Sequence, residues 1–259
     1  MIFDTHAHYD DKQFDSDREA HLASLSSSGV TAVVDVCACT DSIAPVMKLA
    51  ETHPYVYAAV GIHPDEVGGI TPAVLKAMET ALDSPRCVAV GEIGLDYYWD
   101  KESHEVQALW FRRQIEMALA HEKPIIVHSR AAAEDTLRII TALYGSHPIP
   151  NPGIIHCYAY STEMARLYTA MGFCLGIGGV LTYQNSRKLK KVVKNISLDY
   201  LVLETDCPYL APEPHRGSRN TSAYLGYVAE AIAAIKGITR EEVEAATLAN
   251  ARRVFRLEE

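Results

Sequence analysis

Two histidines separated by a single alanine, His6 and His8, end the first apolar run of the chain, MIFDTHAH. In an extended strand, side chains two residues apart point to the same face. His6 and His8 could therefore bind one metal ion from a single strand. An H-x-H pair alone is a weak motif and is equally typical of an ordinary polar strand end. Its meaning depends on which other residues the fold brings to the same place.

Further potential metal ligands stand at the ends of other apolar runs, and these are His63, Glu92, His128, His156 and Asp206. Imidazoles combined with carboxylates suit Zn²⁺, Mn²⁺, Fe²⁺ or Co²⁺, whereas a site made only of oxygen atoms favours Mg²⁺ or Ca²⁺. Together with His6 and His8, these residues offer more ligands than one tetrahedral ion requires. We therefore infer two ion sites that share one carboxylate.

The elements that must position these residues are short runs of nearly continuous apolar character, which is typical of parallel strands covered on both faces. The predicted strands are residues 1–8, 30–36, 56–62, 87–93, 124–129, 153–157, 172–178 and 201–206. Apolar residues recur with helical spacing within 105–123, between two predicted strands. The same spacing recurs over 225–235, and Gly237 is expected to end this second helix. Thr239 and Glu242 form a T-x-x-E capping box that opens a last helix.

Eight strand–helix units predict an α/β protein with one domain over residues 1–259, a (β/α)8 TIM barrel, whose usual length is about 250 residues. A doubly wound open sheet is less favoured because the first turn, HAHYDDKQFD, has no glycine-rich phosphate loop. In such a barrel the carboxyl ends of all strands meet at one rim, where the active site lies. The potential ligands are therefore expected to meet there.

Composition excludes several classes of protein. The chain has 48% hydrophobic and 22% charged residues, as globular proteins do. Charged residues interrupt the N-terminal run and no run is long enough to cross a bilayer, so we expect neither a signal peptide nor a membrane partner. The six cysteines show no C-x-x-C spacing, and a cytoplasmic location is the simplest inference.

A net charge of −9 argues against a broad basic surface for nucleic acid. It does not exclude a local site whose positive charge comes from bound metal ions. Arg130, two residues after His128, and His215 and Arg216 in the loop PYLAPEPHRGSRN are the predicted substrate-binding groups, since arginine binds phosphate or carboxylate through a planar fork. We expect Arg219 to be solvated.

The remaining candidates are expected to be structural. The basic run 187–194 is predicted to be a solvated helix face. Cys157 and Cys207 follow proposed ligands, so alternation predicts that they pack on the opposite face. Surface or helix-terminal positions are predicted for the other histidines, which are His21, His53, His104, His121 and His147.

Over essentially its whole length, the chain resembles the TatD family of metal-dependent hydrolases, within the amidohydrolase-like barrel superfamily. The resemblance rests on DTHAH (4–8), GIHP (61–64), GEIGLDYYWD (91–100), PIIVHSR (124–130), HCYAYS (156–161), ETDCPYLAP (204–212) and PHRGSRN (214–220), in the family's order and with similar spacing. It implies a hydrolase with two metal ions, and deoxyribonuclease activity is the activity most often associated with the family.

Carried over to matching positions, the resemblance implies that one metal is bound by His6, His8 and Asp206 and the other by His128 and His156, with Glu92 bridging both. It also implies that His63 and Arg130 belong to the active site without binding metal.

The chain departs from the family in two loops. It has Tyr158, Ala159 and Tyr160 where many members carry phenylalanine, a small polar residue and glycine, and RNTS lacks a common proline. Since both loops would line the substrate, these departures bear on substrate choice.

The expected reaction is hydrolysis of DNA phosphodiester bonds at single-stranded or frayed ends, preferably as a 3′–5′ exonuclease. Two divalent ions, Mg²⁺, Mn²⁺ or Zn²⁺, would activate a water, and Asp206 and Glu92 would be the catalytic carboxylates. His63, Arg130 and Arg216 would hold phosphates, and Tyr158 or Tyr160 could stack on a base.

Two alternatives remain open. The same site could hydrolyse an ester or amide, for example as a deacylase of aminoacyl-tRNA or of a small metabolite, because fold does not select the substrate. The protein could also bind metal as a scaffold without catalysis. No obligate protein partner is evident.

Overall fold

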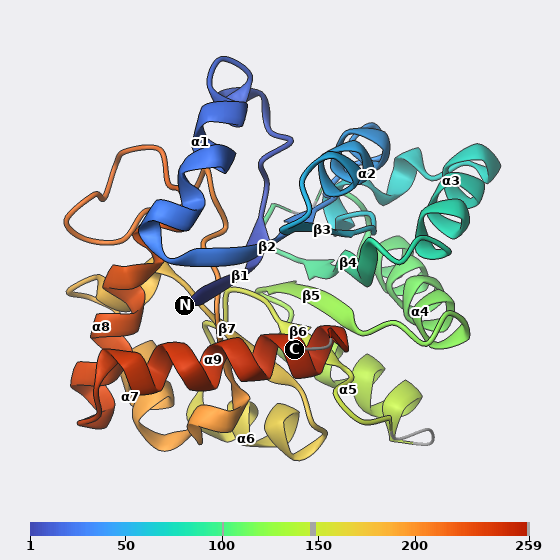
Figure 1. Ribbon diagram of the computed structural model, residues 1–259. Coiled ribbons are helices and arrows are strands. Elements are labelled where there is room, and N and C mark those ends of the chain that lie inside the picture. The colour runs from blue at the N-terminus through green and yellow to red at the C-terminus, as the bar shows by residue number, and fades with distance from the viewer. Residues whose placement is uncertain (100, 146–148, 258–259) are drawn as a thin grey trace.

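A parallel sheet of eight strands forms the centre of the computed structural model, which describes residues 1–99, 101–145 and 149–257 (Figure 1). The strands follow one another in chain order around the sheet, and each neighbouring pair is parallel. Their bounds are β1 Ile2–Ala7, β2 Val30–Val36, β3 Val56–Ala59, β4 Cys87–Asp96, β5 Ile125–Arg130, β6 Gly153–Ile155, β7 Cys174–Ile177 and β8 Leu201–Leu203. A parallel bridge between Ala7 and Cys207 brings the two edges together. The predicted (β/α)8 barrel is confirmed.

Helices surround the strands (Figure 1). They are α1 Arg18–Ser24, α2 Ile43–Thr52, α3 Pro72–Leu82, α4 His104–Ala120, α5 Ala133–Tyr144, α6 Thr162–Ala170, α7 Arg187–Asn195, α8 Leu225–Lys236 and α9 Arg240–Phe255. Gly237, at φ 70°, ends α8, and the Thr239–Glu242 capping box opens α9 as predicted. Within the described ranges no helix is both long and apolar enough to cross a membrane.

Several strands end earlier than their apolar runs. β6 stops at Ile155 and β8 at Leu203, so His156 and Asp206 lie just beyond the strands rather than within them. The backbone turns there, since Cys157 has φ 44° and Asp206 has φ 57°. Apolar character records burial, which continues past the last ladder hydrogen bond. In contrast, β4 continues three residues past its predicted end, to Asp96.

The barrel interior holds a small apolar cluster below the rim. Ile126 and Ile154 belong to this cluster. His128 and His156 follow them in the sequence by two residues each. Because alternate residues share a face, the same side of the barrel wall carries core below and polar groups above. Leu248 and Phe255 of α9 join the cluster, so α9 closes the end of the barrel opposite the rim (Figure 1).

Few backbone hydrogen bonds join β1 to β8, and buried side chains complete this seam. The Asp4 carboxylate accepts hydrogen bonds from the Thr205 amide at 3.0 Å, the Thr205 hydroxyl at 2.6 Å and the Ser222 hydroxyl at 2.6 Å. All three residues are at most 2% exposed, so water cannot replace these bonds. Asp4 therefore fastens the closing strands and the segment before α8 to each other.

We predict that Asp4→Ala lowers the free energy of unfolding by about 3–5 kcal/mol, because it leaves several buried donors without an acceptor. Urea denaturation of the metal-free protein measures this. Asp41→Ala, at an exposed position, is the control and should change stability by less than about 0.5 kcal/mol. Equal stabilities of the two variants would show that the seam does not depend on Asp4.

Candidate metal centre

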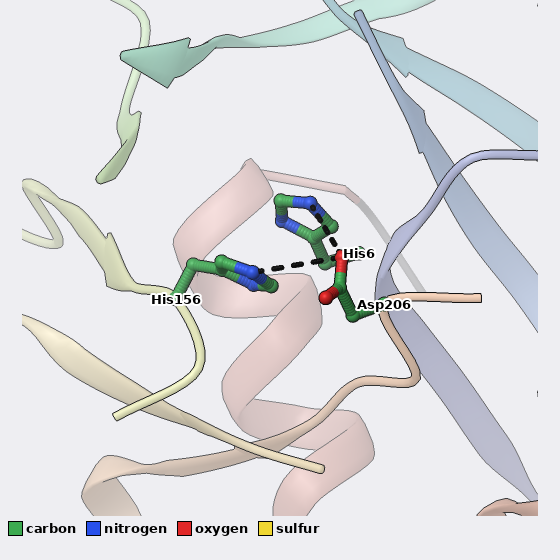
Figure 2. Close-up of side chains that lie close together, drawn as sticks. All are labelled: His6, His156 and Asp206. Carbon is green, nitrogen blue, oxygen red and sulfur yellow. Dashed lines mark ion pairs between the residues drawn. The ribbon is translucent and has the colours of Figure 1, made fainter. Parts of the chain in front are cut away.

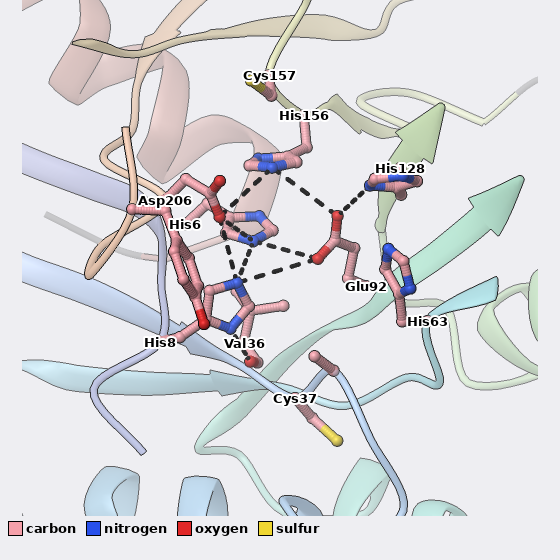
Figure 3. A network of polar contacts seen from close by, with 12 residues as sticks. His6, His8, Val36, Cys37, His63, Glu92, His128, His156, Cys157 and Asp206 are labelled. Atoms are coloured by element: carbon pink, nitrogen blue, oxygen red, sulfur yellow. Dashed lines mark hydrogen bonds and ion pairs between the residues drawn. The ribbon is translucent and has the colours of Figure 1, made fainter. Parts of the chain in front are cut away.

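The Glu92 carboxylate lies at the centre of the rim, with its two oxygens facing different histidines (Figure 3). Oε1 is 2.8 Å from Nδ1 of His128 and 3.8 Å from Nε2 of His156. Oε2 is 3.5 Å from Nε2 of His6 and 4.0 Å from Nε2 of His8. Glu92 is 4% exposed, so these imidazoles replace the water that an ionised carboxylate otherwise requires.

Asp206 faces the same histidines from the end of β8. Its Oδ1 is 3.3 Å from Nε2 of His8, 3.8 Å from Nε2 of His6 and 3.7 Å from Nε2 of His156. Figure 2 shows the Asp206 carboxylate facing both His6 and His156, whose rings stack with centroids 3.6 Å apart. The structure thus brings together all six predicted metal ligands, and Asp206 is near histidines from both of the groups that the family resemblance separates.

Hydrogen bonds and an ion pair behind the imidazoles hold them in place. Nδ1 of His8 is 2.8 Å from the Val36 carbonyl oxygen, which can only accept, so Nδ1 carries the proton and Nε2 is left to bind a cation. Nδ1 of His156 lies 3.2 Å from Oε2 of Glu204. Nε2 of His128 lies 2.9 Å from Oδ2 of Asp96. Such partners orient ligating histidines in metal sites.

Sequence reasoning missed these two outer carboxylates. Asp96 and Glu204 are 0% and 1% exposed, and both stand within motifs quoted above, GEIGLDYYWD and ETDCPYLAP. A carboxylate at the end of a buried strand could have indicated their role. What the spacing did not show is that Asp96 would contact His128 from the neighbouring strand β5, and that Glu204 would contact His156 just past β6, two strands away.

The electrostatics of the cluster favour bound positive charge. Burial raises the pKa of Glu92, but the charges of His156 and His6 and the hydrogen bond with His128 bring it well below its ordinary value. Burial opposes charge on His156, yet Glu204 and Glu92 raise the pKa of this histidine to about 10. The carboxylates therefore attract cations strongly, whether protons or metal ions.

The donor set fits divalent metal ions. Groups whose ligand atoms lie within 4.8 Å of one another include His6, His8 and Glu92; His6, His156 and Asp206; and His63, Glu92 and His128. The Nε2 atoms of His6 and His8 are only 3.1 Å apart in a buried space, so either a proton shared in a hydrogen bond or a metal ion bound by both nitrogens holds them together. Mixed imidazole and carboxylate ligands suit Zn²⁺ and Mn²⁺.

A pocket of about 920 Å³ opens above these residues. Its wall includes His63 and Arg130, two of the four predicted substrate-binding residues. Cys157 also lines it, which contradicts the prediction that this thiol packs on the opposite face; the turn at Cys157 breaks the strand alternation. Cys207 is buried, as predicted.

The hydroxyl groups of the two tyrosines predicted to stack on a base form hydrogen bonds within the protein. Tyr158 is 2% exposed and donates a hydrogen bond to the Ser161 carbonyl oxygen, so its predicted stacking is wrong. The Tyr160 hydroxyl is 2.9 Å from the Ser129 hydroxyl. The buried Tyr158 ring therefore lacks the open face that stacking requires, whereas stacking by the half-buried Tyr160 stays a prediction.

The two other predicted substrate-binding residues, His215 and Arg216, do not line the pocket. His215 stacks on Tyr224 with centroids 4.0 Å apart, and the Arg216 guanidinium lies 4.3 Å from the Tyr183 ring centroid. The predicted contact of His215 and Arg216 with substrate is therefore not supported by their position outside the pocket.

Arg219, predicted to be solvated, instead forms a bidentate ion pair with Asp17, with N–O distances of 3.0 and 2.6 Å. It fastens the loop after β8 to the segment before α1. His21, His53, His104 and His121 lie in or next to helices as predicted, and His147 lies outside the described residues.

Known proteins resemble this chain over its whole length. The family model described as TatD related DNase matches residues 3–256. An uncharacterized metal-dependent hydrolase of Bacillus subtilis, YabD, is 40% identical over 99% of this chain and 100% of its own. A Mycobacterium tuberculosis protein with the same description, TatD, is 36% identical over 99% of this chain and 98% of its own.

Among solved structures, the Escherichia coli TatD homologue YjjV superposes with a TM-score of 0.91 at 28% identity. The match covers 99% of this chain and 98% of the YjjV chain. The (β/α)8 arrangement described above is therefore shared along the entire length of both proteins.

We predict that removing metal with EDTA lowers the melting temperature and that adding Mn²⁺ at about 100 times its dissociation constant restores about 2.7 kcal/mol of stability. For a chain of this size the rise corresponds to about 5–11 °C in a thermal-shift assay. Glu92→Gln should lose most of the rise, because it weakens the negative charge between the histidines.

The matched control is Glu66→Gln, an exposed carboxyl group that lines the same pocket outside the cluster. This variant should keep the full rise. An equal rise in Glu92→Gln and Glu66→Gln would mean that metal binds elsewhere.

Proposed function

This chain belongs to the family of TatD-related DNases, and from that membership we propose that it is a metal-dependent hydrolase that cleaves phosphodiester bonds in DNA. The proposed substrate is a single-stranded or frayed DNA end. All six cysteines are free, which is compatible with the cytoplasm as its proposed location.

One observation carries the proposal of two metal ions. The two oxygens of Glu92 face separate histidine nitrogens, with Oε1 2.8 Å from His128 and Oε2 3.5 Å from His6. A carboxylate arranged in this way can bridge two cations, one on each oxygen. We therefore propose His6 and His8 as ligands of one ion and His128 and His156 as ligands of the other, with Asp206 beside both.

When bound, two divalent ions would polarise a phosphoryl oxygen and make a water molecule more acidic. The protein's own residues supply the remaining steps. Burial disfavours the ionised form of Asp206, but the hydrogen bond with His8 and the charges of His156 and His8 lower its pKa. Asp206 therefore stays ionised, and its carboxylate can accept the proton of the attacking water at the edge of the pocket.

His63 and Arg130 would hold the phosphate that is cleaved. The His63 ring packs edge-on against His128, with centroids 4.3 Å apart, so it lies directly beside the proposed metal ligands. Arg130 follows His128 on β5 by two residues and shares its side of the barrel. A guanidinium group binds two phosphate oxygens through its planar fork, which would orient a DNA backbone over the carboxylates.

We predict that the metal-loaded protein degrades an end-labelled single-stranded oligonucleotide and that EDTA stops the reaction. Asp206→Asn should lower the rate at least about 100-fold, since it removes both a proton acceptor and a negative charge facing the metal ligands. Gel analysis of the products after addition of Mg²⁺, Mn²⁺ or Zn²⁺ measures the rate, and the position of the label shows the direction of cleavage.

Glu66→Gln again serves as the control and should keep nearly the full rate. An oligonucleotide that stays intact under every metal would overturn the nuclease proposal. A parallel panel of esters and amides, including aminoacyl-tRNA, would then identify acyl hydrolysis if any of them is cleaved.

A further inference from the structure

Two large aromatic side chains are exposed beside the pocket, at the end of β4. Tyr98 is 60% exposed and Trp99 is 58% exposed, and their rings are nearly perpendicular with centroids 5.0 Å apart. Trp99 lines the pocket together with Arg130 and Lys101. Neighbouring exposed aromatic rings at the edge of a pocket are a typical feature of a binding site.

The backbone of this pair is held by the same carboxylate that holds a proposed metal ligand. Oδ1 of Asp96 accepts hydrogen bonds from the amides of Tyr98 and Trp99, both at 2.9 Å, while its Oδ2 lies 2.9 Å from Nε2 of His128. Gln107 in turn donates to the Asp96 carbonyl oxygen at 3.0 Å. The backbone that carries the aromatic pair is thus held at a fixed place relative to the proposed metal ligands.

Arg130 joins the aromatic pair from the neighbouring strand. Its guanidinium carbon lies 4.1 Å from the ring centroid of Tyr98 and 5.4 Å from that of Trp99. In the β4–β5 register, Arg130 is opposite Asp96 and His128 is opposite Gly94. Within the described part of the chain, no ion pair with a carboxylate holds the Arg130 guanidinium. Its N–H groups are therefore available to a phosphate next to a stacked ring.

The negative net charge of the protein favours a binding site in which base stacking contributes to DNA affinity. With a charge of −9, the protein cannot rely on a broad basic surface to hold DNA. Stacking of bases on aromatic side chains needs no net charge and tolerates any sequence. Inside a duplex the neighbouring base pairs cover both faces of a base, so such a site favours unpaired bases and strand ends over the interior of a duplex.

We propose that Tyr98, Trp99 and Arg130 form a subsite for single-stranded DNA, in which the aromatic pair stacks on a nucleobase and Arg130 binds the adjoining phosphate. The inference rests on the proposed nuclease function and deepens it, because it names the part of the substrate that the pocket edge recognises.

The first experiment compares an oligothymidylate with the same oligonucleotide carrying abasic residues at the last three positions of each end. Trp99→Ala should lower kcat/KM on the intact oligonucleotide about 5- to 150-fold, mainly through KM. On the abasic oligonucleotide the same substitution should change kcat/KM less than about 2-fold, since no base is left to stack. Trp99→Phe should restore most of the activity.

Tyr227→Ala, which removes an exposed aromatic ring outside the pocket, is the matched control and should leave both substrates unaffected. Equal losses on the intact and abasic oligonucleotides in Trp99→Ala would overturn the subsite, because Trp99 would then act only on the shape of the pocket.

A binding experiment separates the subsite from catalysis. The chain has two tryptophans, so Trp110→Phe leaves Trp99 as the only one. In EDTA, titration with oligothymidylate should quench Trp99 fluorescence to saturation, whereas the abasic oligonucleotide should not. Quenching without cleavage under any metal would support the subsite and refute the nuclease function. Cleavage without quenching would refute the subsite alone.

Discussion

Closure of the barrel between β1 and β8 is the constraint on which the rest of the structure depends. His6 lies in the first strand, His8 directly follows it and Asp206 follows the last strand, so these candidate ligands meet only if the two edges of the sheet join. The seam has few ladder hydrogen bonds, among them one from the His8 amide to the Cys207 carbonyl oxygen at 2.8 Å. Asp4 reinforces it with a carboxylate that binds Thr205 and Ser222. A buried acid in the seam thus helps to place the proposed metal ligands.

The rim concentrates negative charge, and neighbouring imidazoles balance it. Glu92, Asp96 and Glu204 are each at most 4% exposed, and each faces a histidine. Burying an unpaired carboxylate is strongly unfavourable, so the histidines stabilise the fold as well as offering ligands. The same arrangement explains how an acidic protein can provide a site for an anionic substrate. Cations bound among these carboxylates would reverse the local charge without altering the charge of the outer surface.

Asp96 connects the two parts of the pocket. One of its oxygens orients His128, and the other holds the backbone of the exposed aromatic pair. Because one short carboxylate spans both, the distance between the metal centre and the aromatic rings is set by a single buried group rather than by a long loop. Tyr158, in contrast, is buried in the pocket wall and bound to Ser161, and the Tyr160 hydroxyl is bound to Ser129. The proposed base-binding side of the pocket is the end of β4.

The sequence by itself determined the barrel, the order of its elements and the positions of the six candidate ligands. The apolar runs, the helical period and the Thr239 capping box are local properties, and the carboxyl end of each strand must lie at the same rim. Only the tertiary structure decided which groups touch. Asp96 binds His128 from the neighbouring strand, Glu204 lies against His156, and Arg219 pairs with Asp17 some 200 positions away. The tertiary structure also places Cys157 in the pocket wall, and it places His215 and Arg216 outside the pocket. The reason is physical: a side chain's partners depend on the register between strands and on turns such as those at Cys157 and Asp206, which hydrophobic periodicity does not encode.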